Sequence, residues 1–399
     1  MGGNWPSERR APTIEPRRLR VLYLASSLHY GGAERQIVEL VRRLDRSRFE
    51  PVLCCLDGVD TLARDLNPAA PVLPLKKRHR LDITVVPRLM RLILRQRIDV
   101  VHSFLFDAEI AGRLAGRLCG VSAVIASERN SAYPPMPVHE ALLKLTRPLF
   151  DLQIANSHAG RAYSLRRLHT PPAAVRVVPN GVDVSRFRPH DASELRARLN
   201  IPAKSRVVGM FASFKPQKNH HMYVRVIQRI SKILPETRFL FVGHTPSGDP
   251  VAMAHRQEIL KRLEEEGLAD RCLHLLERSD MEDLYCLCDV TVLTSIREGT
   301  PNVVLESMAS GVPVVATDVA DNARIIADAG AVVPLDDDAA MSAWVVRLLE
   351  NEAVRRQMGT AARQRAVNEY SLDRLARSTE QVYLEAVHRR NGRPCHNGQ

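Results

Sequence analysis

Short apolar runs alternate with longer amphipathic segments along most of the chain, a pattern typical of parallel α/β architecture. Residues 20–26 (RVLYLAS) form the first expected strand, and residues 33–44 repeat apolar side chains at helical spacing. The other strands expected in the first half span residues 51–56, 98–103, 121–126 and 152–155. Helix-type patterns separate most of these strands, so we expect the strands to run parallel.

A second series of strands and helices begins after residue 200, behind a segment rich in Pro, Asn, Asp and Gly at 177–194. Such a segment between two complete series indicates a domain boundary. Each series is too short for a closed barrel of eight strands, which favours two open sheets side by side. The strands expected here span 206–212, 238–242, 272–276, 289–294 and 312–316, and the helices 219–233, 251–266, 280–287, 302–309, 338–350, 352–368 and 371–389.

Composition narrows the classes of function. The 399 residues carry a formal net charge of +12, which permits nucleic acid, an anionic membrane surface or a phosphorylated substrate as partner. An aromatic content of only 5% and the lack of a nucleic-acid-binding motif argue against nucleic acid. We find neither an apolar run of about 18 residues nor a secretory signal. The seven scattered Cys predict no disulfide framework or zinc site, so we expect a cytoplasmic protein.

The strongest chemical signal lies in residues 294–317 (TSIREGTPNVVLESMASGVPVVAT). A strand ends there, and a loop leads into a helix for which Asn302 is a suitable N-cap. Backbone N–H groups at such a helix start attract a diphosphate, and Gly299 lets the chain approach a ligand closely. Glu298 and Glu306 bracket the loop and can accept hydrogen bonds from vicinal hydroxyls. The alternative is an ordinary solvated helix start.

This stretch resembles the E-x7-E element of retaining glycosyltransferases of family 4, here Glu298-x7-Glu306. The similarity extends to VVPNGVDVSRFRP (177–189), ASFKPQKNH (212–220) and DLYCLCDVTVLTS (283–295), and covers about residues 19–388. It implies a retaining hexosyltransferase that moves a sugar from a nucleotide diphosphate donor to a glycan or lipid-linked acceptor, in polysaccharide or glycolipid synthesis.

The resemblance also implies a GT-B fold of two Rossmann-like domains facing across a cleft. We expect an acceptor domain at 19–195, a donor domain at 196–370 and a helix at 371–389 that crosses back to the first domain. Residues 1–18 and 390–399 are expected to be a disordered basic arm and a disordered tail.

By the same resemblance, Glu306 binds the donor ribose and Glu298 contacts the transferred sugar. The backbone of Gly299, Thr300, Pro301 and Asn302 would hold sugar hydroxyls and the diphosphate. No cofactor is implied, and the sequence contains no coherent metal site.

Lys218 follows an expected strand and precedes a helix, where its charge could neutralise the leaving diphosphate. The family usually places an Arg five residues ahead of this lysine, but this chain has Ser213. Lys215, or an Arg from another loop, is expected to substitute. The alternative for Lys218 is a surface lysine without a role.

In the first half, Gly31 and Gly32 join a strand to a helix, where a ligand can approach the helix start. The resemblance implies that they lie under the donor phosphate or the acceptor, although most glycine pairs only make turns. His102 ends a strand and either faces the cleft or is a core histidine. Glu128, Arg129 and Asn130 occupy the region in which many relatives carry a His, and are candidates for the acceptor side.

Two charged clusters allow more than one interpretation. Asp336, Asp337 and Asp338 could be taken for a metal-binding DxD, but they precede a helix and are better explained as its cap. Arg88, Arg91 and Arg95 share one helical face, which suits an anionic membrane surface. An ordinary surface helix that packs its apolar side inward explains the three arginines equally well.

Other functions also fit the sequence. A nucleotide-sugar epimerase or a phosphorylase could use a similar two-domain cleft, and a non-catalytic membrane-associated scaffold could retain the fold. Glu298, Glu306 and Lys218 together argue against a scaffold.

Overall fold

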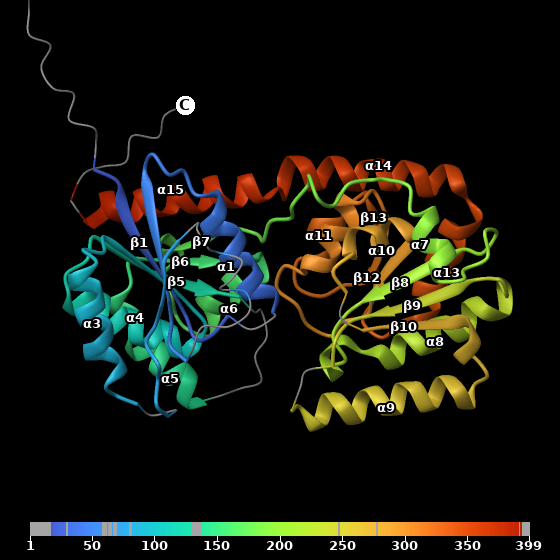
Figure 1. The fold of residues 1–399 in the computed structure, drawn as a ribbon, viewed down its shortest axis with the longest axis horizontal. Helices are drawn as coiled ribbons and strands as arrows, with labels where there is room; N and C mark the ends of the chain where they lie inside the picture. Colours follow the sequence, from blue (N-terminus) through green and yellow to red (C-terminus); the bar gives the residue numbers. More distant parts are fainter. Residues whose placement is uncertain are drawn as a thin grey trace, which may run out of the picture.

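The computed structural model describes residues 17–28, 31–57, 62, 66, 70–79, 82–129, 137–245, 248–276, 278–390 and 392. Its described strands form two separate parallel sheets, with helices on both faces of each (Figure 1). This is the doubly wound α/β architecture that the alternating pattern predicts.

The first sheet has seven strands, in the order β3-β2-β1-β4-β5-β6-β7. Its strands are β1 (Leu19–Ala25), β2 (Phe49–Cys55), β3 (Val72–Pro74), β4 (Val100–Phe104), β5 (Ala123–Glu128), β6 (Leu152–Ala155) and β7 (Val175–Val177). The described helices of this half are α1 (Gly32–Arg43), α3 (Val85–Arg95), α4 (Phe106–Leu118), α5 (Pro137–Leu145) and α6 (His158–Arg166).

The second sheet has six strands, in the order β10-β9-β8-β11-β12-β13. Its strands are β8 (Val207–Phe211), β9 (Arg238–Val242), β10 (Cys272–Leu275), β11 (Val290–Leu293), β12 (Val314–Thr317) and β13 (Gly330–Val333). The helices are α7 (Ser193–Arg198), α8 (His220–Ile233), α9 (Pro250–Glu265), α10 (Met281–Leu287), α11 (Asn302–Ala309), α12 (Asn322–Ile326), α13 (Asp338–Glu350), α14 (Glu352–Glu369) and α15 (Leu372–Arg390).

Both faces of each sheet are buried, which explains why the strands are continuous apolar runs. In β1, Val21 and Tyr23 point into a core shared with α1 and α15, while Leu22 and Leu24 point into a second core shared with α3 and α4. The second sheet is likewise sandwiched between two apolar clusters. Every strand expected from the sequence is present within a few residues. Strands β3, β7 and β13, which are not in the expected series, are three or four residues long and lie at the sheet edges.

The C-terminal helices connect the two halves. Helix α14 packs against α11, and α15 then crosses to α1, β5 and β6 (Figure 1). Beside this crossing, Val182 forms backbone hydrogen bonds with Tyr370 and Leu372. A Cβ on Gly181 would lie 2.8 Å from the Cα of Leu372, so a glycine is needed where the two connecting segments touch.

In both sheets the strand order reverses at the first strand, between β1 and β4 and between β8 and β11. Ligands of open α/β sheets bind at this switch point, beyond the carboxyl ends of the strands. A ligand site is therefore expected at the loops after β1, β8 and β11, and residues of all three loops line one cavity.

Candidate functional site

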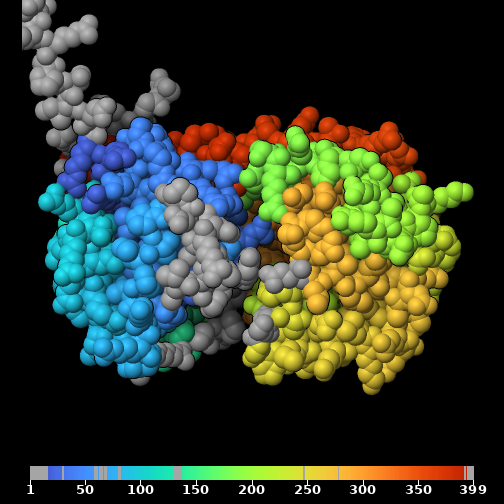
Figure 2. All heavy atoms as spheres, viewed as in Figure 1, coloured from blue at the N-terminus to red at the C-terminus, as the bar shows by residue number. Residues whose placement is uncertain are grey.

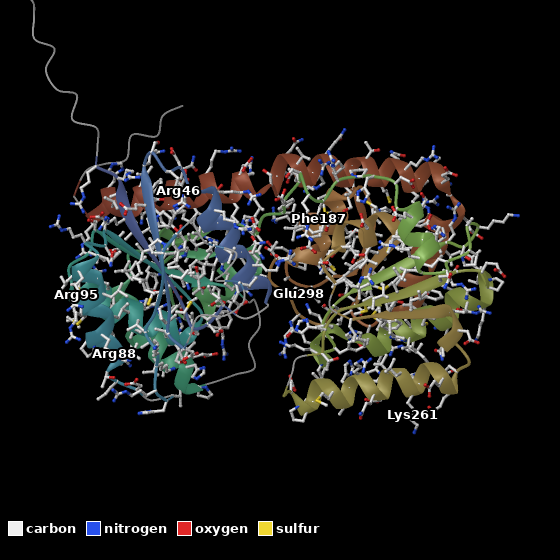
Figure 3. The ribbon with its side chains drawn as sticks, viewed as in Figure 1. Arg46, Arg88, Arg95, Phe187, Lys261 and Glu298 are labelled. Carbon is white, nitrogen blue, oxygen red and sulfur yellow. The ribbon has the colours of Figure 1, made fainter. Side chains whose placement is uncertain are left out.

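A cleft of about 990 Å³ separates the two halves, and the space-filling view shows the division (Figure 2). Its volume matches that of a pocket for a nucleotide-sized ligand. Glu298 lies where the halves meet (Figure 3). The cleft brings together most of the site residues expected from the sequence: Gly31, Gly32, Arg129, Lys218, Glu298, Gly299, Thr300, Pro301, Asn302 and Glu306.

The loop between β11 and α11 reaches across to the first half of the chain. A Cβ on Gly299 would lie 2.8 Å from the side-chain amide of Asn156 and 2.9 Å from the carbonyl oxygen of Arg129. Thr300 Oγ1 also donates a hydrogen bond to the Asn156 carbonyl. Only glycine fits at position 299, so the backbone at the start of α11 is held against the opposite wall of the cleft.

Asn302 does not cap α11, and this prediction was wrong. The helix begins at Asn302, and no side-chain hydrogen bond caps it. Instead, Asn302 Oδ1 accepts a 2.8 Å hydrogen bond from Asn180, and its Nδ2 donates a 3.1 Å bond to the Gly32 carbonyl. The side chain therefore bridges the two halves, and Pro301, Asn302 and Val303 at the helix start line the cleft.

Glu306 lies one turn inside α11 and is 6% exposed. Its Oε2 accepts a 2.8 Å hydrogen bond from the Tyr285 hydroxyl, and its Oε1 lies 3.3 Å from the guanidinium of Arg35. Burial raises the pKa of this carboxyl above its usual range, while the positive charge of Arg35 opposes the rise. Sequence reasoning missed Arg35 and Tyr285, because their contacts with Glu306 arise only in the folded chain.

Lys218 and Glu298 form an ion pair in the cleft, with Nζ and Oε1 2.5 Å apart. Lys218 ends the short 3-10 helix η3 (Pro216–Lys218), and its carbonyl accepts a 2.8 Å hydrogen bond from Thr294 Oγ1. The side chains of Lys218 and Glu298 are only 20% and 9% exposed. Lys218 is therefore not a solvated surface lysine; its charge is fixed inside the cleft.

Lys215 is exposed and is not among the described residues that line the cleft. Ser213 does line it, at the position of the arginine usual in the family, and other loops supply cations nearby. Arg129 is one of them: it donates a 3.1 Å hydrogen bond to Asn180, and its Nε is buried without a hydrogen-bond partner. Burial lowers the pKa of Arg129 to about 10, so it stays charged at neutral pH.

The remaining residues proposed for the acceptor side are placed differently. His102 is a core residue, because its ring nitrogens lie 2.7 Å from the Tyr383 hydroxyl and 2.7 Å from Ser127 Oγ. Burial holds its pKa well below the usual range. Glu128 is buried at the end of β5 and is not among the described residues lining the cleft. Asn130 lies outside the described residues.

Asp337 accepts a 2.8 Å hydrogen bond from the backbone N–H of Ala340, which confirms the capping interpretation, and Asp338 pairs with Arg225. On α3, Leu89 and Ile93 are buried in the core beneath the helix. Arg88 pairs with Asp82 and donates a hydrogen bond to the Leu75 carbonyl, whereas Arg91 and Arg95 are exposed. Membrane binding through this helix stays a prediction.

The facing Rossmann-like sheets and the cleft between them define the GT-B class of proteins, and comparison with known proteins agrees. The chain matches the family described as Glycosyl transferases group 1 over residues 191–365 and Glycosyltransferase Family 4 over residues 30–186. The crystal structure of Anabaena Alr3699/HepE in complex with UDP superposes with a TM-score of 0.80 at 20% identity, covering 92% of this chain and 100% of that one.

Two relatives extend the match along most of the chain. A D-inositol 3-phosphate glycosyltransferase of Kineococcus radiotolerans is 30% identical, over 92% of this chain and 89% of its own length. An Escherichia coli UDP-Gal:alpha-D-GlcNAc-diphosphoundecaprenol alpha-1,3-galactosyltransferase is 23% identical, over 77% of this chain and 80% of its own. This chain belongs to the group 1, family 4 glycosyltransferases, and is therefore a glycosyltransferase. Among its described residues, no helix is both long and apolar enough to cross a membrane.

Proposed function

We propose that this glycosyltransferase moves a sugar from a nucleotide diphosphate donor to a glycan or lipid-linked acceptor, retains the anomeric configuration and needs no metal ion. The observation that carries the proposal is the cleft itself. The Lys218–Glu298 ion pair, the buried Glu306 carboxylate and the start of α11 all line one cavity. These groups match the three parts of such a donor: diphosphate, sugar and ribose.

Each part of the donor has a proposed partner. The Glu306 carboxylate accepts hydrogen bonds from the ribose hydroxyls, while Glu298 contacts the transferred sugar. The backbone from Gly299 to Asn302 holds the diphosphate and sugar hydroxyls at the helix start, where partial positive charge favours an anion. Gly31 and Gly32 lie opposite, where the lack of side chains gives the ligand space beside α1.

The reaction we propose is a displacement on one face of the sugar. The bond between the anomeric carbon and the diphosphate oxygen breaks, and the acceptor oxygen bonds to the same carbon from the same side. The acceptor proton passes to the leaving diphosphate, and Lys218 stabilises the negative charge that develops there. Because Lys218, Arg129 and the helix start supply positive charge, the diphosphate has no need of a metal ion.

We infer that Arg129 takes over from the arginine that Ser213 replaces. It reaches the cleft from the first half of the chain, beside Gly299, and lines the same cavity as Lys218 and Glu298. Lys215 is a weaker candidate because it is exposed and does not line the cleft. Arg129→Gln should therefore weaken donor binding more than Lys215→Ala.

The acceptor is proposed to enter along α1, where Val38 and Arg42 line the same cavity. The E. coli relative is named for a lipid-linked acceptor, diphosphoundecaprenol carrying GlcNAc. This supports a glycan or lipid-linked acceptor here. Peripheral association with the cytoplasmic face of a membrane would suit such an acceptor.

The proposal is tested by a thermal-shift screen of the purified protein against a panel of nucleotide sugars, with and without EDTA. We expect one donor to raise Tm, with an equal increase in the presence of EDTA. Arg129→Gln should reduce this increase, and Lys215→Ala serves as the comparison. No shift with any donor in a well-folded sample would contradict a preformed donor site, and a shift abolished by EDTA would contradict metal independence.

A further inference from the structure

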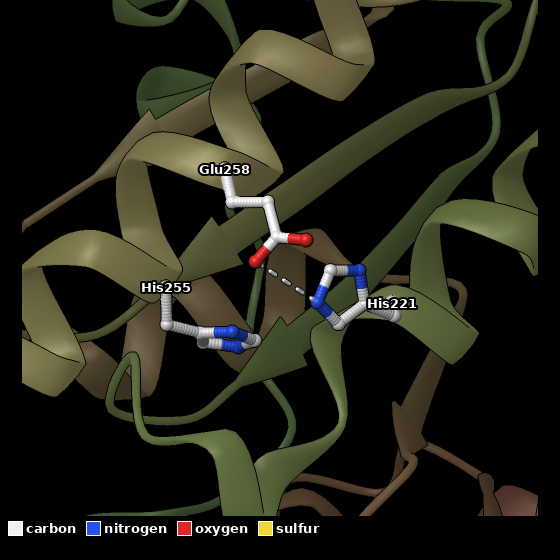
Figure 4. A group of neighbouring side chains, drawn as sticks. All are labelled: His221, His255 and Glu258. Carbon is white, nitrogen blue, oxygen red and sulfur yellow. Dashed lines mark ion pairs between the residues drawn. The ribbon is translucent and has the colours of Figure 1, made fainter.

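A second cluster of potential ligand groups lies outside the cleft, between α8 and α9. His221 is in the first turn of α8, while His255 and Glu258 lie one turn apart on α9, on the same face of that helix. None of the three is among the described residues that line the cleft. Figure 4 shows the side chains converging from the two helices. The donor site does not account for this cluster.

The geometry of the cluster suits a metal ion. One ligand atom from each of the three residues lies within 4.8 Å of those of the other two, and His221 Nε2 is 3.5 Å from Glu258 Oε2. A tetrahedral zinc site, with ligand bonds of about 2.0–2.2 Å, needs its ligand atoms somewhat closer together. Glu258 can provide this contraction, because its side chain is 65% exposed and can turn toward the two histidines.

A buried neighbour orients the central ligand. His220 Nδ1 lies 3.3 Å from His255 Nε2, and His220 also hydrogen-bonds the backbone of Ala212. Because the Ala212 N–H is donated to the Val242 carbonyl, the Ala212 carbonyl accepts from His220. In the tautomer in which His220 Nδ1 accepts from His255 Nε2, the Nδ1 lone pair of His255 is left for a ligand. Metal-binding histidines usually have such a partner on their second nitrogen.

A simple ion pair does not account for all three residues. An ion pair with Glu258 would explain His221 alone, but it would not explain the approach of the His255 ring, whose centroid is 5.1 Å from that of His221.

We propose that His221, His255 and Glu258 bind a divalent transition-metal ion, with Zn²⁺ as the best match, and that the bound ion fastens α9 to the start of α8. Two imidazoles and one carboxylate are a common ligand set for zinc, with water completing the tetrahedron. Helix α9 also packs against η3, which ends in Lys218. The ion therefore stabilises the packing of α9 against the segment that carries Lys218, and it takes no part in the reaction.

The test is a calorimetric titration of the full-length protein with Zn²⁺ alone. The protein is first stripped of metal and its thiols are reduced, and no donor is present. The variants are His221→Ala and Glu258→Gln, which alter side chains 30% and 65% exposed and should leave the fold intact. His388→Ala, at an exposed position on α15, is the matched control. Co²⁺ absorption spectra separate nitrogen and oxygen ligands from thiolates.

We expect one saturable site in the wild type and the control. The affinity for Zn²⁺ should fall at least about 100-fold in His221→Ala and about 10-fold or more in Glu258→Gln. Losses of this size are typical when a residue that holds or orients a metal ion is replaced. Zn²⁺ should raise Tm by a few degrees in the wild type and the control, but not in these two variants. Equal affinity in all four proteins, thiolate bands in the Co²⁺ spectrum, or no saturable binding to the wild type would overturn the proposal.

Discussion

Replacing Lys218 by alanine removes the positive charge that the proposed mechanism needs most. Lys218 lies in the cleft with its side chain only 20% exposed and its Nζ 2.5 Å from Glu298. At a separation of about 4 Å and an effective dielectric constant of about 20, two unit charges interact by about 4 kcal/mol. Only part of a unit charge develops on the leaving diphosphate in the transition state. We therefore expect a loss of about 3 kcal/mol, or roughly 100-fold or more in kcat.

The assay is steady-state release of the nucleoside diphosphate from the donor chosen by the thermal-shift screen. Lys218→Ala should lower kcat, because the interaction strengthens as the leaving charge develops. Its Tm should also fall, since the buried carboxylate of Glu298 loses its partner. Lys261→Ala is the matched control, because that side chain is 75% exposed on the outer face of α9 (Figure 3). A folded Lys218→Ala protein with kcat within threefold of wild type, or with only KM changed, would show that Lys218 does not stabilise the leaving diphosphate.

Other changes test the remaining contacts. Glu306→Gln should weaken binding of the selected donor by roughly 10-fold or more in calorimetry, because a charged hydrogen-bond acceptor is lost; unchanged affinity would remove Glu306 from the ribose site. Since the pKa of Glu306 is raised, acidification should weaken donor binding of the wild type, relative to Glu306→Gln, at a higher pH than the usual carboxyl range near 4.3. Parallel pH curves would contradict this. Gly299→Ala should reduce kcat/KM about 10-fold or more with an unchanged Tm, because the added Cβ meets backbone 2.9 Å away and must move the loop; full activity would show that the loop position is unimportant. Tyr383→Phe should lower stability by about 1–3 kcal/mol in denaturant unfolding, because it removes hydrogen bonds to His102 and Tyr23; an unchanged midpoint would argue against this network.

The sequence predicts the long buried strands well because burial on both faces produces continuous apolar runs. Strand β3 has no such signal, since it is three residues long and none of its side chains is fully buried. Strand β7, at the opposite edge of the sheet, is equally short, and Val175 is its one buried side chain. Whether so short a segment forms an edge strand depends on its pairing with the neighbouring strand and not on its own composition.

At the site, the sequence predicts the residues that local motifs define and misses those that tertiary contacts define. Asn302 is a residue type that often caps helices, but its side chain instead forms hydrogen bonds with Asn180 and Gly32 across the cleft. Arg35 reaches Glu306 only because the two halves of the chain face each other.

The zinc cluster could not be predicted for the same reason. His255 and Glu258 have suitable spacing on one helix, but His221 joins them only when α8 and α9 pack together. No spacing rule links residues that distant along the chain.

In the proposed reaction, the cleft releases a nucleoside diphosphate from a nucleotide sugar and passes the sugar on with its configuration retained. The most direct measurement is NMR of the anomeric proton signals during turnover of the selected donor, with EDTA present, using wild type and Lys218→Ala. The wild type should form an initial product with the anomeric configuration of the donor, and the variant should form it roughly 100-fold more slowly. An initial product of the opposite configuration, or turnover that depends on added metal, would contradict it.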